Sequence, residues 1–145
     1  MFNVDMDNTL IYSYKHDIGE EKHCAEIYKG REISFMTNKT GKLLKELAQK
    51  VLIVPTTTRT REQYERIDLG LGTIPYALVC NGGVLIKDGV EVEEWYADSK
   101  KLIANCKYEL ARGMELLEQD EDRCYDVIFI RELFFVFRLR RRPFV

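Results

Sequence analysis

The sequence predicts an α/β fold, in which strands of one parallel sheet are joined through a helix. Two continuous apolar runs, 51–54 and 74–80, are typical of buried parallel strands. A short apolar segment at residues 2–4 predicts an earlier strand, and an amphipathic segment at 40–50 predicts the helix between them. A strand, a helical crossover and a second buried strand together make a βαβ unit.

The N-terminal strand ends in two carboxylates, Asp5 and Asp7. Open α/β sheets bind their ligands where a strand ends and a turn begins. The carboxylate of Asp5 and the backbone carbonyl of Asp7 can converge on one hard cation. If that cation held a phosphate, Asp5 could attack phosphorus, and Asp7 could protonate the leaving oxygen and later take a proton from water. The alternative interpretation is an acidic turn after an edge strand.

The polar segment 11–31 predicts a loop followed by a hairpin over 26–33, with Lys29 and Gly30 at its turn. His16 and His23 are expected on the surface rather than at a metal, because no helical face brings them together.

The helix expected at 40–50 has one apolar face and one charged face, and Thr37 to Thr40 supply capping residues before it. The strand after it ends in consecutive threonines, Thr56, Thr57 and Thr58. Their hydroxyls follow the strand expected beside the one that carries Asp5, so both groups should face one crevice. The threonines could instead cap a helix over 61–66, and a helix N-terminus favours both capping and phosphate binding.

The strand at 74–80 is closed by Asn81, Gly82 and Gly83, which also suit an ordinary turn. Beyond it the sequence predicts a hairpin over 84–92 that turns at Asp88-Gly89, a helix over 100–118, and strands over 125–130 and 133–139. Trp95 is expected to pack in the core or against the hairpin.

Three landmarks in this order resemble the haloacid-dehalogenase-like (HAD) phosphatase superfamily: Asp5, Asp7 and Thr9; Thr57 with Arg59; and Asn81-Gly82-Gly83. Asn8 stands where that family most often has Gly, and Asn tolerates positive φ. The resemblance is to the branch with a large α/β cap, which includes Cof-like, sucrose-phosphatase-like and phosphomannomutase-like proteins. It implies an incomplete Rossmann-like core of three α/β layers and a parallel sheet at 1–83, followed by the opening part of an α+β cap at 84–145.

The same resemblance implies a magnesium-dependent phosphohydrolase that acts on a small phosphorylated metabolite, such as a sugar phosphate, through an aspartyl-phosphate intermediate. In that scheme Asp5 is the nucleophile, Asp7 is the acid/base, and both bind magnesium. Thr57 and Asn81 bind phosphate, and Thr9 either joins them or supports the loop.

The sequence departs from the family because no later Lys and acidic motif complete the cation site. The pair Asp122 and Asp126 has suitable spacing but follows no predicted strand. We therefore expect a truncated phosphatase whose uncovered sheet self-associates into a homo-oligomer. A phosphomutase and a non-catalytic domain that binds a cation or phosphate, or serves as a scaffold, are the alternatives.

Composition restricts the partners. A net charge of −2 and a pI near 5.8 argue against a nucleic-acid-binding protein, and the basic end, with Arg138, Arg140, Arg141 and Arg142, is expected to be solvated. No apolar run is long enough to cross a membrane and no signal peptide is evident, so the expected compartment is the cytoplasm. The widely spaced cysteines are expected to be reduced thiols.

Overall fold

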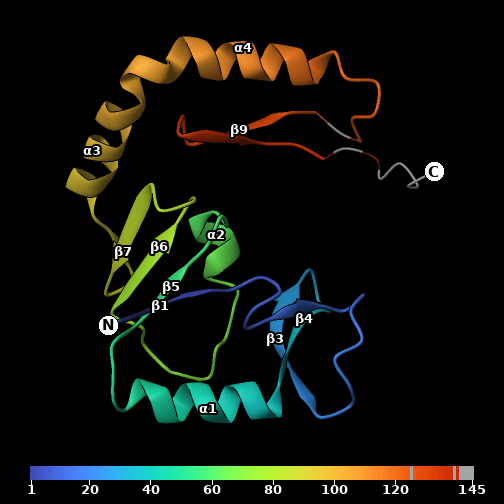
Figure 1. Ribbon diagram of the computed structural model, residues 1–145. Helices are drawn as coiled ribbons and strands as arrows, with labels where there is room; N and C mark the ends of the chain where they lie inside the picture. The colour runs from blue at the N-terminus through green and yellow to red at the C-terminus, as the bar shows by residue number, and fades with distance from the viewer. Residues whose placement is uncertain (125, 139, 141–145) are drawn as a thin grey trace. The chain divides into compact units, whose positions relative to one another are not determined.

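The computed structural model describes residues 1–124, 126–138 and 140, and they form a mixed α/β protein (Figure 1). Two compact units divide the chain at Glu93, namely Met1–Glu93 (unit 1) and Glu94–Val145 (unit 2).

Unit 1 is built on a five-stranded sheet with the strand order β1-β5-β6-β7-β8. Its strands are β1 (Phe2–Asp5), β5 (Ile53–Thr56), β6 (Tyr76–Val79), β7 (Val84–Lys87) and β8 (Val90–Glu91). The first three are parallel, whereas β7 and β8 pair antiparallel. The hairpin expected over 84–92 is present, but it pairs with β6 and makes the sheet mixed, whereas the sequence predicts a parallel sheet for the core. The turn at Asn81-Gly82-Gly83 reverses the chain, and the following hairpin extends the same sheet within unit 1.

The tight turns of unit 1 lie where the sequence predicts them. Lys29 and Gly30 have φ values of 50° and 74°, and Asp88 and Gly89 have values of 49° and 81°. Two consecutive residues with positive φ match the right-handed twist of the strands that they join. The predicted turns at Lys29-Gly30 and Asp88-Gly89 are both confirmed.

The first of these turns joins two strands of a second, antiparallel sheet, which we call the flap. Its order is β2-β4-β3, with β2 (Tyr12–Ser13), β3 (Lys22–Tyr28) and β4 (Arg31–Thr37). The register of β3 against β4 shifts between Cys24 and Ile27, so the strand is irregular around Glu26. Such irregularities turn a side chain toward a new direction.

Helix α1 (Asn38–Ala48) begins two residues before the expected start, because Thr37 Oγ1 accepts a hydrogen bond from the backbone N–H of Thr40 at 3.1 Å. Leu44 on this helix joins a buried cluster that includes Val4 of β1 and Ile53 of β5. In Figure 1 the helix runs below these two strands. The helix thus covers one face of the sheet, while Asn3 and Asp5 are exposed.

Unit 2 contains α3 (Glu93–Ile103), a 3₁₀ turn η1 (Ala104–Cys106), α4 (Lys107–Glu118), and an antiparallel pair, β9 (Ile128–Ile130) and β10 (Phe134–Val136). The single helix expected over 100–118 is therefore interrupted. Asn105 lies at the interruption, where its short amide side chain competes with the helix for backbone hydrogen bonds.

Trp95 lies on α3 and is 43% exposed, so the expectation that it packs in a core is wrong. Tyr125 and Leu139, at the ends of the two predicted strands, lie outside the described residues, as do Arg141 and Arg142. Arg138 and Arg140 are exposed. A helix with the length and apolarity needed to span a bilayer is not found in the described part of the chain.

Candidate functional site

The carboxyl ends of β1, β5 and β6 lie side by side in the sheet. Asp5 is in register with Thr56, and Thr56 is in register with Leu78. Asp5, Thr57 and Asn81 all line one open cleft of about 310 Å³ at this edge, together with Thr56. Three of the residues predicted from the sequence are therefore brought together, and we call this hollow the strand-end cleft.

Asp5 is exposed, and one of its carboxylate oxygens is held in place. Oδ2 accepts a hydrogen bond from Thr9 Oγ1 at 3.1 Å, whereas Oδ1 has no partner among the described residues. Thr9 reaches back to Asp5 because the chain turns at Asn8, which has a φ of 60° as the sequence predicts. Thr9 therefore supports the carboxylate of Asp5 and does not contribute to the cleft wall.

Thr57 is 3% exposed and is fixed by hydrogen bonds. Its hydroxyl oxygen accepts from the backbone N–H of Arg59 at 3.2 Å. A hydroxyl has one donor proton and two acceptor lone pairs, so the proton of Thr57 remains able to bind a ligand oxygen.

Three backbone hydrogen bonds connect the loop after β5 to the end of β6. The N–H of Thr57 donates to Leu78 O at 2.9 Å, that of Asn81 to Thr57 O at 2.9 Å, and that of Cys80 to Arg59 O at 2.7 Å. Asn81 itself has a φ of 57°. The spacing of Thr57 and Asn81 in the cleft is thus set by the main chain.

The helix after β5 is capped by Thr60, and not by the threonine run at Thr56 to Thr58. Thr60 and Gln63 form a reciprocal capping box at the start of α2 (Arg61–Tyr64), which is shorter than the helix expected over 61–66. The hydroxyl of Thr57 is therefore separate from the cap.

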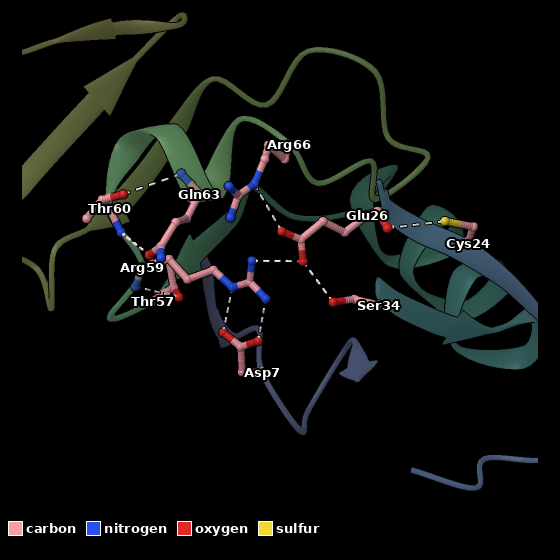
Figure 2. A network of polar contacts seen from close by, with 9 residues as sticks. All are labelled: Asp7, Cys24, Glu26, Ser34, Thr57, Arg59, Thr60, Gln63 and Arg66. Atoms are coloured by element: carbon pink, nitrogen blue, oxygen red, sulfur yellow. Dashed lines mark hydrogen bonds and ion pairs between the residues drawn. The ribbon is translucent and has the colours of Figure 1, made fainter. Parts of the chain in front are cut away.

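Asp7 is held by Arg59 (Figure 2). The guanidinium binds both carboxylate oxygens, with Nε donating to Oδ2 and Nη2 to Oδ1, each at 2.8 Å. Such two-point contacts fix the plane of the carboxylate as well as its position. Each oxygen keeps a second lone pair, so proton transfer at Asp7 remains available.

The same guanidinium contacts a second carboxylate, that of Glu26 on β3. Arg59 Nη1 donates to Glu26 Oε2 at 2.9 Å, and Ser34 Oγ donates to the same oxygen at 2.8 Å. The other oxygen of Glu26 accepts from Arg66 Nε at 3.2 Å. The side chain of Glu26 is fully buried, with 0% exposure. Figure 2 shows Glu26 between the two arginines, with Ser34 beside it.

Burial of the Arg59 side chain opposes its charge, but the hydrogen bond and the charge of Asp7, followed by those of Glu26, prevail and raise the pKa of Arg59 above its ordinary value. Arg59 is therefore a permanent cation between two carboxylates. Asp7, Arg59, Glu26 and Arg66 also line a second hollow of about 590 Å³, whose other wall comes from the flap, including Lys15 and His16 in the loop between β2 and β3. We call it the flap cleft.

Sequence reasoning did not assign Glu26, Ser34 or Arg66 to the site. Glu26 reads as one exposed position in an alternating hairpin, and its contact with Arg59 spans 33 residues along the chain. The only available signal was a carboxylate within an otherwise ordinary strand. The sequence predicts the hydroxyl of Thr56 at the crevice but assigns it no role. Its Oγ1 is buried and lacks a hydrogen-bond partner within the described residues.

Two oxygen ligands expected for magnesium are the carboxylate of Asp5, at the end of β1, and the carbonyl of Asp7, in the turn that follows. Within the described residues, no group of three or more His, Cys, Asp or Glu side chains is arranged to hold a metal ion. Magnesium is commonly held by one or two carboxylates, with water and substrate phosphate completing the coordination. The donors present, including Asp5 Oδ1, which has no partner in the described part of the chain, fit a magnesium ion bound in that way.

The two histidines are not among the residues that line the strand-end cleft. His16 and His23 are exposed, as expected, and a ring nitrogen of His23 lies 3.0 Å from Asn38 Oδ1. The Asp126 side chain is 96% exposed and pairs with Arg123 at 3.1 Å. All four cysteines carry free thiols, as the sequence predicts.

The chain was also compared with known proteins. No model of a known protein family matches it, and no match was found among curated proteins.

Proposed function

We propose that this protein is a magnesium-dependent phosphohydrolase of the HAD type, which acts on a small phosphorylated metabolite through an aspartyl-phosphate intermediate. The observation that carries the proposal is the convergence of Asp5, Thr57 and Asn81 on the strand-end cleft. A carboxylate with one unpartnered oxygen, a hydroxyl able to donate, and a strand-end amide are groups suited to a phosphoryl group.

In the proposed reaction, Asp5 Oδ1 attacks phosphorus while the bond from phosphorus to the leaving oxygen breaks. Asp7 gives its proton to that oxygen, so the product leaves as an alcohol. Water then attacks the phosphorus of the aspartyl phosphate, Asp7 takes the proton from this water, and inorganic phosphate leaves with Asp5 restored. In both steps the hydroxyl of Thr57 donates a hydrogen bond to a phosphoryl oxygen.

Asp5 and the carbonyl of Asp7 are the groups that would hold magnesium in this proposal. When bound, the ion would neutralise charge on the phosphoryl oxygens beside the carboxylate nucleophile. Thr9 keeps Asp5 Oδ2 in place, and Arg59 keeps the carboxylate of Asp7 in place.

The flap cleft supports a small metabolite as the substrate. Asp7 lines this cleft, so a leaving group whose oxygen is protonated by Asp7 would extend into it. Its volume of about 590 Å³ is within the range of small-molecule sites, roughly 300–1,000 Å³. Its lining is polar and carries charges of both signs, which suits a hydroxylated leaving group such as a sugar.

The test is magnesium-dependent release of phosphate from a panel of sugar phosphates and a chromogenic aryl phosphate, with Asp5→Asn measured in parallel. We expect release by the natural chain and a loss of at least about 10³-fold in the variant, since it lacks the nucleophile. Asp17→Asn, which changes an exposed carboxylate on the loop between β2 and β3, is the matched control.

Equal activity of Asp5→Asn and the natural chain would contradict the proposed mechanism. If the folded chain released no phosphate but bound it, a non-catalytic phosphate-binding domain would replace the enzyme as the conclusion. Phosphoryl transfer to a second sugar, rather than to water, would favour a phosphomutase.

A further inference from the structure

Glu26 is the most deeply buried charged side chain near the site, although the proposed reaction gives it no role. Its carboxylate has 0% exposure and accepts three hydrogen bonds, two of them from arginines. Burying a charge is costly unless it is paired and hydrogen-bonded, and all three donors are in place here. A carboxylate that is fixed in this way restricts the orientation of the side chains that pair with it.

Glu26 binds the guanidinium of Arg59, which also holds Asp7. Arg59 uses one nitrogen on Glu26 and its two others on Asp7. The guanidinium is planar and rigid, so fixing Nη1 on Glu26 leaves little freedom for Nε and Nη2. The orientation of the Asp7 carboxylate therefore depends on a residue that Asp7 does not contact.

Arg66 and Ser34 make this anchor firm. Arg66 Nε donates a hydrogen bond to Oε1 of Glu26, and Ser34 Oγ and Arg59 both donate to Oε2. Ser34 is on β4, so Glu26 is held by the neighbouring strand of the flap and by the segment after α2 at once. The register of β3 is irregular at Glu26, and this irregularity directs the side chain toward Arg59.

We propose that Glu26 is a positioning residue for proton transfer: it fixes the guanidinium of Arg59, which in turn holds the carboxylate of Asp7 in line with the leaving oxygen. This inference rests on the proposed function and adds to it a dependence of the acid/base step on the flap. The side chain of Glu26 is fully buried, so it would act on the reaction only through Arg59 and Asp7.

The first experiment measures the physical link without any substrate. Hydrogen exchange of the Arg59 Nε–H is followed by NMR in the natural chain, in Glu26→Gln and in the control Glu65→Gln. Glu65 also pairs with an arginine, Arg61 at 2.6 Å, next to the same short helix, but it does not contact Arg59 or Asp7. We expect exchange at Arg59 to rise by about tenfold or more in Glu26→Gln alone, because Gln offers one carbonyl oxygen where Glu has two acceptors.

The second experiment compares two leaving groups. A nitrophenolate leaves as a stable anion and needs no proton, whereas an alkoxide from a sugar phosphate needs one. A defect in the positioning of Asp7 should lower kcat on the sugar phosphate by about tenfold while changing the aryl phosphate less than about twofold. A general loss of structure would lower both alike.

Arg59→Lys serves as the second variant if Glu26→Gln does not fold. Lysine keeps the positive charge but cannot bind both carboxylates in the geometry of the guanidinium, so it should give the same dependence on the leaving group. Circular dichroism identifies any variant that is unfolded.

The outcomes separate this inference from the proposed function. Unchanged exchange at Arg59 in Glu26→Gln, or equal losses on both substrates, would overturn the role of Glu26 while leaving Asp5-dependent hydrolysis intact. Absence of any Asp5-dependent phosphate release would overturn both. Faster exchange together with a selective loss on the sugar phosphate would support both.

Discussion

The two units of this protein use charged and apolar residues in different ways. In unit 1, Arg59 pairs with Asp7 and Glu26 across 52 and 33 residues of sequence, and Glu26 is fully buried. In unit 2, the pairs Lys101–Asp98, Arg112–Glu115 and Arg123–Asp126 each join residues three apart in sequence, and all of these side chains except that of Arg123 are exposed. Helix α1 of unit 1 buries Leu44, whereas neither α3 nor α4 buries any residue.

This difference shows that an amphipathic pattern is enough to predict a helix but not enough to predict that its apolar face is buried in a core. Leu110, Met114 and Leu117 lie on the apolar face of α4 and are only partly buried, whereas Leu44 of α1 is 4% exposed. Closure of a core and fixing of charges both require contacts between distant segments, and these are concentrated in unit 1. The proposed chemistry depends on that kind of contact.

The largest effect on stability is expected at the buried network. Glu26→Ala should lower the free energy of unfolding by about 3–5 kcal/mol, since it leaves Arg59 and Arg66 without their shared partner. Glu115→Ala in unit 2 removes an exposed pair with Arg112 and should cost less than about 1 kcal/mol. Urea unfolding followed by circular dichroism measures both. Similar costs for the two variants would remove the distinction between the units.

An intermediate effect is expected at the helix starts. Thr37→Ala should cost about 1 kcal/mol, because the first turn of α1 loses the acceptor for Thr40 N–H. At α4 the capping position is Cys106, which makes no side-chain cap hydrogen bond, so Cys106→Ala should change stability little. Thermal unfolding of the two variants tests this, and a larger loss at Cys106 would mean that its thiol has a different role.

The smallest effect concerns pH. Burial, with a further contribution from the charge of Glu65, raises the pKa of Tyr64 above its ordinary value of 10.0. The unfolded chain therefore loses this proton first, so the stabilisation is complete below pH 10.0 and is lost as pH rises through the folded pKa. Tyr64→Phe should make this decline shallower, as measured by urea unfolding across that range. Tyr108→Phe, on the exposed surface of unit 2, controls for the loss of a phenol.

Features of the fold that depend on neighbouring residues could be predicted from the sequence. The turns at Lys29-Gly30 and Asp88-Gly89, and the positive φ at Asn8, follow from the backbone freedom of Asn, Asp and Gly. The convergence of Asp5 with Thr57 and Asn81 could also be predicted, because parallel strand ends share one edge of a sheet.

Contacts between distant segments could not be predicted in the same way. Nothing in the hairpin pattern distinguishes Glu26, which is buried against Arg59, from Glu32, which is exposed on the next strand. The direction of β7 likewise depended on whether the chain after Asn81 left the sheet or paired back onto it. Both are decided by the free energy of packing against partners far away in sequence.

The backbone hydrogen bonds between the loop at Thr57 and the end of β6 fix the spacing of the strand-end cleft, whereas the side chains decide which groups the cleft offers to a ligand. Since peptide groups make these bonds, replacing the side chains of Thr57 or Thr58 would alter reactivity and leave the spacing of the cleft unchanged. Asn81 is the exception, because its positive φ restricts substitutions there to residues such as Gly or Asp. The side chains that line the strand-end cleft could therefore be changed, by selection or design, to bind new ligands without rebuilding the sheet beneath.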